Sequence, residues 1–166
     1  VVANRIMLFS DRASRYMTGI YVQGCRARGN RVTGTHNGSS GSLAGLTQIY
    51  YAGTLEGNSV VLVAGNAVES RGIDLSTHYN PDAAIWLHNN LLCGVGGTNS
   101  VGLYKDSGCQ ATVSNSYNLI HGFQQAATNC TPGPGTLTSA PRFADDALHL
   151  ASSSLAVDAG TNQDWM

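Results

Sequence analysis

The chain has 166 residues, a net charge of −1 and 42% hydrophobic residues, which is enough apolar material for one domain with a sizeable core. Nine basic and ten acidic side chains give no positive field for a phosphate backbone, and the longest apolar run, residues 60–64, is far shorter than the roughly 20 residues of a membrane span. The sequence therefore predicts no nucleic-acid partner and no membrane span. The 20 Gly, 13 Asn, 16 Ser and 13 Thr, against two Glu and one Lys, favour short strands and turns over exposed helices.

Two short phrases recur along the chain. In the first, Asn is followed within two residues by an aliphatic residue; it begins at Asn4, Asn30, Asn58 and Asn90 and last at either Asn115 or Asn118. The second consists of Gly19-Ile20-Tyr21-Val22, Gln48-Ile49-Tyr50-Tyr51, Gly72-Ile73-Asp74-Leu75 and Gly102-Leu103-Tyr104-Lys105. Both recur every 24 to 32 residues and show the alternation of a short strand with one buried face.

A repeat of this length, built from strands and Gly/Asn turns, predicts an all-β fold: a single-stranded parallel β-helix, or solenoid, of about five coils. Inward Ile, Val and Leu side chains would stack into the core, and the recurrent Asn would form a hydrogen-bonded ladder. The alternative is that Asn only marks turns. We expect coils over residues 1–125, and over residues 126–166 a loop and capping segment of the same domain, since three prolines interrupt strand stacking there.

The first residues of the chain already lie inside a repeat. Solenoids normally cover the open edge of their first coil with a cap. We therefore expect either continuation into further N-terminal coils or end-to-end stacking of the uncapped first coil on another copy.

The second phrase predicts a row of outward side chains. Its third residue lies between inward ones, so Tyr21, Tyr50, Asp74 and Tyr104 would stack on the outer surface. Sugars bind such rows with their C–H faces on the rings and their hydroxyls on carboxylates, which predicts a polysaccharide partner. The alternative is that these tyrosines only cover neighbouring strand residues.

A long connection over residues 76–82 follows Asp74 and would wall a groove. For an active site in that groove, the candidates for acid or base are Asp74, His78 and Asp82. Trp86 would join the tyrosines as a binding platform. The five histidines share no ligand spacing, and the sequence shows no cluster of acidic ligands. We therefore predict no metal site and no cofactor. Binding of Ca²⁺ is an alternative that no ligand cluster indicates.

The C-terminal half resembles a known group of proteins. The stretches 109–120, 140–143, 148–150 and 154–160, together with Cys130, resemble the C-terminal end of secreted bacterial right-handed parallel β-helix proteins, a superfamily that includes adhesin-like proteins and polysaccharide lyases. Leu155 departs from that pattern, where Pro is usual. The resemblance implies a right-handed coil, an extracellular or cell-surface location and a disulfide between Cys109 and Cys130; the alternative is four reduced thiols. It supplies no catalytic residue.

Two functions follow as hypotheses. The first is an extracellular β-helix module that binds polysaccharide or serves as an adhesin-like structural unit. The second is a polysaccharide lyase or glycoside hydrolase that acts in a groove on the outer face. An ice-binding face is a weaker third hypothesis, because the threonines form no regular ranks.

Overall fold

The computed structural model describes residues 1–13, 15–75 and 81–160, which contain twelve strands and no helix. Within them, accordingly, no helix is long and apolar enough to cross a membrane. The strands are β1 (Arg5–Ser10), β2 (Arg15–Gln23), β3 (Arg26–Arg28), β4 (Arg31–His36), β5 (Gly41–Ile49), β6 (Gly53–Glu56), β7 (Ser59–Leu75), β8 (Ala84–His88), β9 (Leu91–Lys105), β10 (Thr112–Ser116), β11 (Leu119–His121) and β12 (Gln125–Thr128).

All these strands pair in parallel with strands one coil away. They form an eight-stranded sheet containing β1, β4, β7, β5, β2, β9, β11 and β12, and a four-stranded sheet in the order β10-β8-β6-β3. The predicted all-β parallel solenoid is confirmed, with about 4 turns rather than five. Beyond β12 the described residues add one bridge to the stack, Leu119 to Leu137, and one local antiparallel bridge, Phe143 to Leu150. Pro132 and Pro134 have no N–H to continue the stack.

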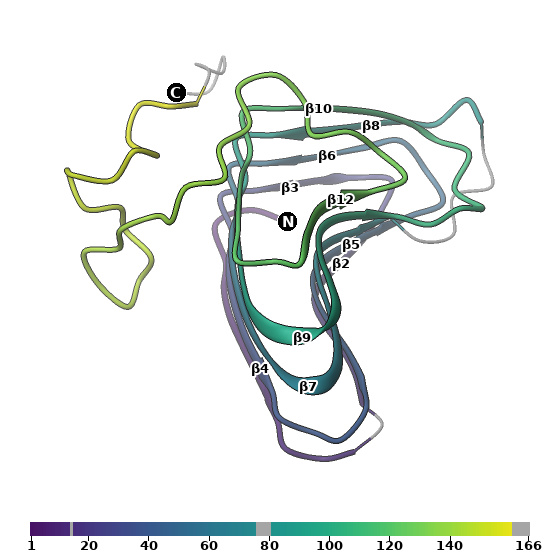
Figure 1. Cartoon of the computed structure of the whole chain (residues 1–166). Helices are drawn as coiled ribbons and strands as arrows, with labels where there is room; N and C mark the ends of the chain where they lie inside the picture. Colours follow the sequence, from purple (N-terminus) through teal and green to yellow (C-terminus); the bar gives the residue numbers. More distant parts are fainter. Residues whose placement is uncertain (14, 76–80, 161–166) are drawn as a thin grey trace.

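Viewed along the stack, each coil follows a bent outline with a lower lobe and an arm to one side (Figure 1). The chain descends along β4 and the first half of β7, turns, ascends along β5 and the second half of β7, and returns along the four-stranded sheet through β6 and β8. The outer faces of β2, β5, β7 and β9 form a concave corner where the lobe meets the arm. We call this surface the concave corner; it is the place where neighbouring coils can present a common outer row.

The turn before the strand that follows each ladder residue has the same backbone conformation at five successive positions along the stack. Its ladder residues are Asn4, Asn30, Asn58, Asn90 and Asn118, so the last phrase begins at Asn118 and not at Asn115. The residue before each of them has a left-handed φ of 53° to 63°; these residues are Ala3, Gly29, Gly57, Asn89 and Tyr117. Glycine and asparagine tolerate this conformation best, which explains their recurrence at this turn.

Each ladder asparagine from Asn4 to Asn90 donates its backbone N–H and its Nδ2 to the Oδ1 of the asparagine in the next coil, at 2.9–3.1 Å. The inner rungs, Asn30 to Asn118, are at most 1% exposed. Their Nδ2 groups also donate to backbone carbonyls, as Asn58 does to Ala27 O at 3.0 Å. Buried amides of this kind are stable only when their donors and acceptors are paired, and the ladder pairs them.

The interior is a continuous stack of aliphatic side chains, including Val32, Leu43, Leu55, Ile73 and Leu92, all fully buried. A second, smaller cluster lies outside this core. There, residues from 137–156 pack on the outer side chains of β9 and β11. The later part of the C-terminal segment therefore packs against the side of the stack, where Figure 1 shows it in yellow, while residues 134–137 hydrogen-bond to the free edge of the last coil at residues 117–120.

Candidate functional site

The pairing register decides which side chains share a row at the concave corner. Tyr21 pairs with Thr47, Thr47 with Asp74, Asp74 with Tyr104, and Tyr104 with Thr128. Three of the four predicted members are therefore in the row. Tyr50 is not; Thr47 holds that position, so the predicted register is wrong by three residues in this coil.

The structure shows why the alignment slipped. The repeated element is Gly followed by Ile or Leu, at Gly19, Gly45, Gly72 and Gly102, and the copy in this coil is Gly45-Leu46-Thr47-Gln48 rather than Gln48-Ile49-Tyr50-Tyr51. Tyr50 lies one residue beyond β5 with a left-handed φ of 64°. Recurrence of Gly was a stronger signal than recurrence of Ile-Tyr, because the Gly position admits no side chain.

Arg71 and Asp74 meet because the two residues between them both face the interior. A Cβ on Gly72 would point at interior atoms of Leu92 and Phe123, and the next residue, Ile73, is also fully buried. Two consecutive inward residues place the flanking side chains on the same outer face. Arg71 Nη1 donates to Asp74 Oδ2 at 2.9 Å, and Nη2 donates to Glu69 Oε2 at 3.0 Å.

Tyr104 completes this cluster. The guanidinium of Arg71 lies 3.8 Å from the centroid of the Tyr104 ring, and Tyr104 Oη donates to Asp106 Oδ2 at 3.3 Å. Burial acts to lower the pKa of Arg71, but Asp74, Tyr104 and Glu69 outweigh it and raise that pKa. Burial also raises the pKa of Tyr104, against the opposing effect of Arg71. The arginine therefore stays charged, and a stacked ion-pair cluster forms the floor of the corner.

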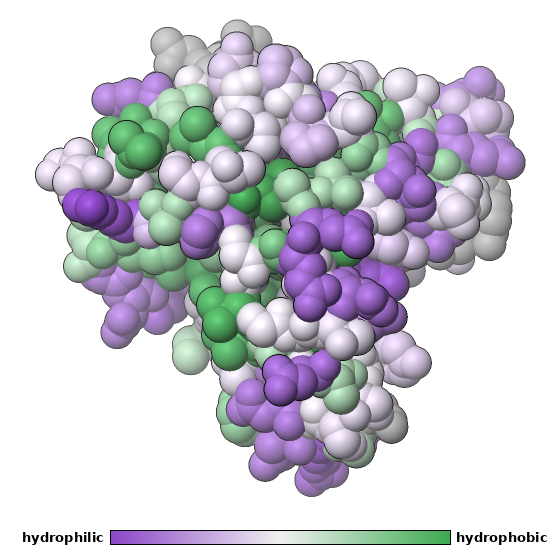
Figure 2. All heavy atoms as spheres, viewed as in Figure 1, coloured by the Kyte–Doolittle hydropathy of each residue, from purple (hydrophilic) through white to green (hydrophobic). Residues whose placement is uncertain are grey.

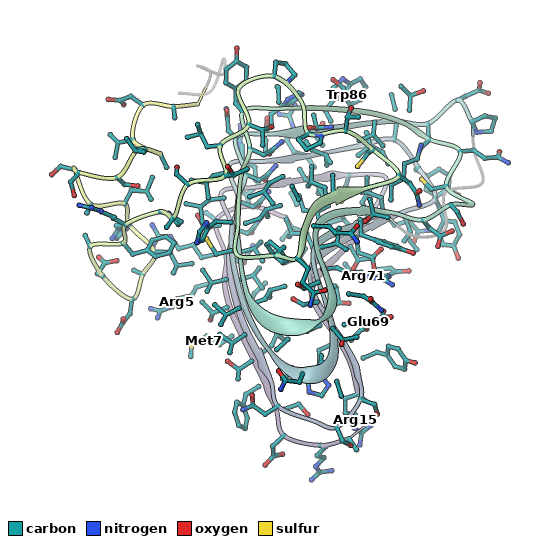
Figure 3. The ribbon with its side chains drawn as sticks, in the orientation of Figure 1. Arg5, Met7, Arg15, Glu69, Arg71 and Trp86 are labelled. Atoms are coloured by element: carbon teal, nitrogen blue, oxygen red, sulfur yellow. The ribbon has the colours of Figure 1, made fainter. Side chains whose placement is uncertain are left out.

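The accessible side chains lie around this floor. The Asp74 side chain is only 12% exposed, whereas that of Glu69 is 42% exposed. Tyr21 and Tyr16 on β2 are 60% and 85% exposed, and Tyr16 belongs to the row that contains Ser42 and Glu69. Figure 2 shows hydrophilic side chains gathered at the corner, and Figure 3 shows Glu69 and Arg71 side by side on it. Sequence reasoning missed Glu69 and Tyr16, which the Gly-based alignment would have brought into register.

The other predicted site residues lie elsewhere or are not described. Trp86 is 43% exposed but lies on β8, on the outer face of the four-stranded sheet, and Figure 3 shows it far from Arg71. The predicted platform of Trp86 with Tyr21 and Tyr50 is therefore wrong. Asp82 is exposed just before β8. His78 and most of the 76–82 connection lie outside the described residues.

A polar ladder accompanies Trp86 on the four-stranded sheet. Arg28, Glu56, His88 and Ser116 share one row. Glu56 is 3% exposed and its carboxylate faces Arg26 Nε at 3.3 Å, while His88 Nδ1 lies 2.8 Å from Ser116 Oγ. Burial lowers the pKa of His88, partly opposed by Glu56. The ion pair with Arg26 offsets the charge of the buried carboxylate, which is the usual requirement for a charge in such a position.

The four cysteines are free thiols. The predicted disulfide between Cys109 and Cys130 is therefore absent. Cys109 is buried in the core cluster, and Cys130 Sγ contacts Leu103 O at 3.8 Å. Burial raises the pKa of the Cys130 thiol, which keeps it protonated.

No group of three or more His, Cys, Asp or Glu in the described part of the chain is arranged to hold a metal ion. A cavity of about 490 Å³ lies between the C-terminal segment and the ladder turn. Leu91, Leu119, Leu137, Leu148 and Leu150 supply most of its apolar lining. It is separate from the concave corner and continues the smaller apolar cluster.

Comparison with protein-family models, curated proteins and solved structures finds no match to this chain.

Proposed function

We propose that the chain is a module of an extracellular, bacterial parallel β-helix protein and binds polysaccharide at the concave corner. The observation that carries this proposal is the register of the corner, which aligns Tyr21 with Asp74 and Tyr104, and Tyr16 with Glu69. Exposed tyrosine rings beside a carboxylate are what a sugar chain requires: flat apolar faces for its C–H groups and acceptors for its hydroxyls.

The charge state of the corner supports binding over acid–base catalysis. Arg71 pairs with both carboxylates nearest to it, and the side chain of Asp74 is largely covered. A general acid or base must reach the proton that it transfers, and the covered carboxylate of Asp74 is already occupied by Arg71. The role of Asp74 is therefore to hold Arg71 in place against the ring of Tyr104. The side chains that contact the ligand are Tyr21, Tyr16 and Glu69. The lyase or hydrolase alternative stays a prediction.

The test is binding to a panel of neutral and acidic polysaccharides, measured by isothermal titration calorimetry, with new reducing ends and unsaturated uronates assayed in the same samples. We expect binding without product. Tyr21→Ala should weaken binding about fivefold, since a ring contact contributes roughly 1 kcal/mol.

Trp86→Ala is the matched control, an exposed aromatic side chain on the other sheet, and should leave the affinity unchanged. Equal loss in both variants, or no binding to any polysaccharide, would contradict the proposed face. Product formation that disappears in Asp74→Asn would establish the enzyme instead.

A further inference from the structure

The charged side chains of the concave corner are unequal in number. Glu69 and Asp74 bind Arg71, and Asp106 accepts a hydrogen bond from the tyrosine whose ring stacks on that arginine. Three carboxylates and one guanidinium give this cluster a formal charge of −2. Residues 76–80 include no Asp, Glu, Lys or Arg and add no formal charge to it. The corner therefore attracts a cationic ligand and repels an anionic one.

Two further cations on the same strands lie outside this cluster. Lys105 follows Tyr104, so strand alternation turns its side chain to the opposite face, where its partner one coil earlier, Leu75, is fully buried. Burial raises the pKa of the Cys130 thiol and the Lys105 ammonium opposes this effect, so the lysine acts on the Cys130 side of the strand. Arg15 begins β2, and Figure 3 shows it near the end of the lobe. The cluster keeps its excess of negative charge.

The guanidinium of Arg71 is already occupied. Its Nη1 donates to Asp74 Oδ2 at 2.9 Å, its Nη2 donates to Glu69 Oε2 at 3.0 Å, and the Tyr104 ring covers one face at 3.8 Å. The carboxylate of an acidic sugar would have to displace one of these partners and would then lie beside the displaced charge. Juxtaposed like charges cost binding energy, which disfavours an acidic polysaccharide at this surface.

Two acceptors at the corner remain without a partner. The Glu69 side chain is 42% exposed, and its Oε1 accepts no hydrogen bond from the described residues, since Arg71 binds Oε2. Thr47 lies in the row between Tyr21 and Asp74 and is 7% exposed; its Oγ1 is buried and has no hydrogen-bond partner within the described part of the chain. A buried hydroxyl without a partner is costly, and a ligand N–H that reached it would remove that cost.

Exposed aromatic rings accompany these acceptors. Tyr16 shares a row with Glu69, and Tyr21 shares one with Thr47; both rings project into solvent from β2. The face of an aromatic ring carries partial negative charge and attracts ammonium groups. Ring faces together with unpaired carboxylate oxygens are the features that recognise an ammonium ion, whereas a neutral hydroxyl gains little from the charge of the cluster.

We propose that the polysaccharide bound at the concave corner carries free amino groups, and that Glu69 Oε1 and the ring faces of Tyr16 and Tyr21 bind its ammonium ions. This inference rests on the proposed function, because it names the ligand class of the same site. Acidic polysaccharides are excluded by the occupied arginine, and neutral ones bind through the rings alone.

The test compares three tetrasaccharides on the full chain by isothermal titration calorimetry near pH 6: tetraglucosamine, its fully N-acetylated form and tetragalacturonate. The first two differ only in the charge of the amino group. We expect tetraglucosamine to bind about fivefold more tightly than the N-acetylated form, which is the scale of one accessible ion pair, and tetragalacturonate to bind most weakly. The preference should shrink when the salt concentration rises from about 20 mM to about 0.5 M.

Glu69→Gln should reduce the preference for tetraglucosamine to less than twofold. It should also strengthen the binding of tetragalacturonate, because Arg71 loses one of its two carboxylates. Asp146→Asn is the matched control, since it removes one exposed carboxylate on the C-terminal segment and should leave the preference unchanged. An oligolysine peptide of equal charge should bind more weakly than tetraglucosamine, because it offers no sugar face to the rings.

The outcomes separate this inference from the proposed function. Equal affinity for tetraglucosamine and its N-acetylated form, tightest binding of tetragalacturonate, or a preference that Glu69→Gln leaves intact would overturn the inference, while polysaccharide binding at the corner would stand as long as Tyr21→Ala weakens it. Oligolysine binding as tight as that of tetraglucosamine would also overturn it, because charge alone would then explain the attraction. Absence of binding by all three tetrasaccharides would contradict the proposed function and this inference with it.

Discussion

Asn58 is the central rung of the ladder and is completely buried. Its Oδ1 accepts from both the backbone N–H and the Nδ2 of Asn30, and its own Nδ2 donates to Asn90 Oδ1 and Ala27 O. One side chain therefore joins three coils. Because water has no access to this turn, any partner left without its hydrogen bond keeps its full desolvation penalty.

Replacing Asn58 by Ala should lower the free energy of unfolding by about 3 kcal/mol, since several buried donors and acceptors lose their partners. Urea denaturation followed by circular dichroism measures this change. The matched control is Asn4→Ala at the exposed end of the same ladder, for which we expect a loss below about 1 kcal/mol. Equal losses of unfolding free energy in the two variants would show that the stability contributed by a ladder asparagine does not depend on its burial.

Thiol reactivity should separate Cys25 from Cys93. Cys25 is exposed, whereas Cys93 is buried and its burial raises the pKa of the thiol to about 12. Near pH 8 only roughly one Cys93 in 10,000 would be a thiolate, the reactive form. Iodoacetamide should therefore label Cys25 at least 100-fold faster in the folded chain, and 6 M guanidinium should remove the difference. Mass spectrometry of the labelled peptides follows both sites, and comparable native rates would contradict the burial of Cys93.

At the scale of the strand, glycine determines how closely successive coils approach. A Cβ added to Gly19, Gly45, Gly72 or Gly102 would lie 2.6–2.8 Å from the carbonyl oxygen of the equivalent residue in the next coil. At Gly45 it would also overlap the side chain of Val60. Carbonyl oxygens held in a parallel ladder cannot move aside, so this position excludes every other residue type without a backbone shift.

Gly45→Ala should therefore lower the free energy of unfolding by about 2 to 3 kcal/mol. Gly65→Ala is the control: its added Cβ would meet backbone atoms only at 3.5 Å, an ordinary contact, and we expect a change within about 0.5 kcal/mol. Thermal and urea denaturation of the two variants measure the difference. If Gly45→Ala left the free energy of unfolding unchanged, neighbouring coils would be able to move apart at Gly45 to admit a Cβ, which would contradict this prediction.

For the whole molecule, the solenoid predicts a gradient of stability along the stack. Each coil contacts only its neighbours, so the middle coils gain two interfaces and the first coil gains one. Amide exchange of the chain alone should be slowest in β7, which pairs with β4, β5 and β9, and fastest in β1, which among the described strands pairs with β4 alone. Peptide-level mass spectrometry resolves the two strands. Uniform protection from β1 to β7 would contradict nearest-neighbour stabilisation.

Part of the fold could be predicted from the chain because it depends on local chemistry. Recurrent asparagine at a turn, and Gly or Asn before it, reflect a left-handed backbone conformation that few residues adopt. Alternating apolar residues between such turns can bury only one face of a strand. The all-β parallel solenoid and its ladder follow from these local requirements, and so does the outward direction of Tyr21, Asp74 and Tyr104.

The number of turns and the effect of the prolines could not be predicted from the local sequence pattern. The residues after β12 carry turn signals like those inside the coils, yet Leu137 makes only one bridge to Leu119. Whether a segment adds a coil or covers one depends on the backbone groups that the previous coil leaves free. The segment ending at Gly160 likewise packs against the side of the stack because an apolar row is exposed there.

The sequence by itself determined the architecture, the first four ladder asparagines and three members of the outer row, because turn conformation and strand alternation are properties of neighbouring residues. Only the tertiary structure decided that Thr47 and not Tyr50 completes the row, that Arg71 joins Asp74, and that Trp86 lies on another face. It also decided that Cys109 and Cys130 are free thiols. These features depend on the register between coils, which is set by contacts between residues more than twenty positions apart, such as the close approach of Gly45 to Gly72.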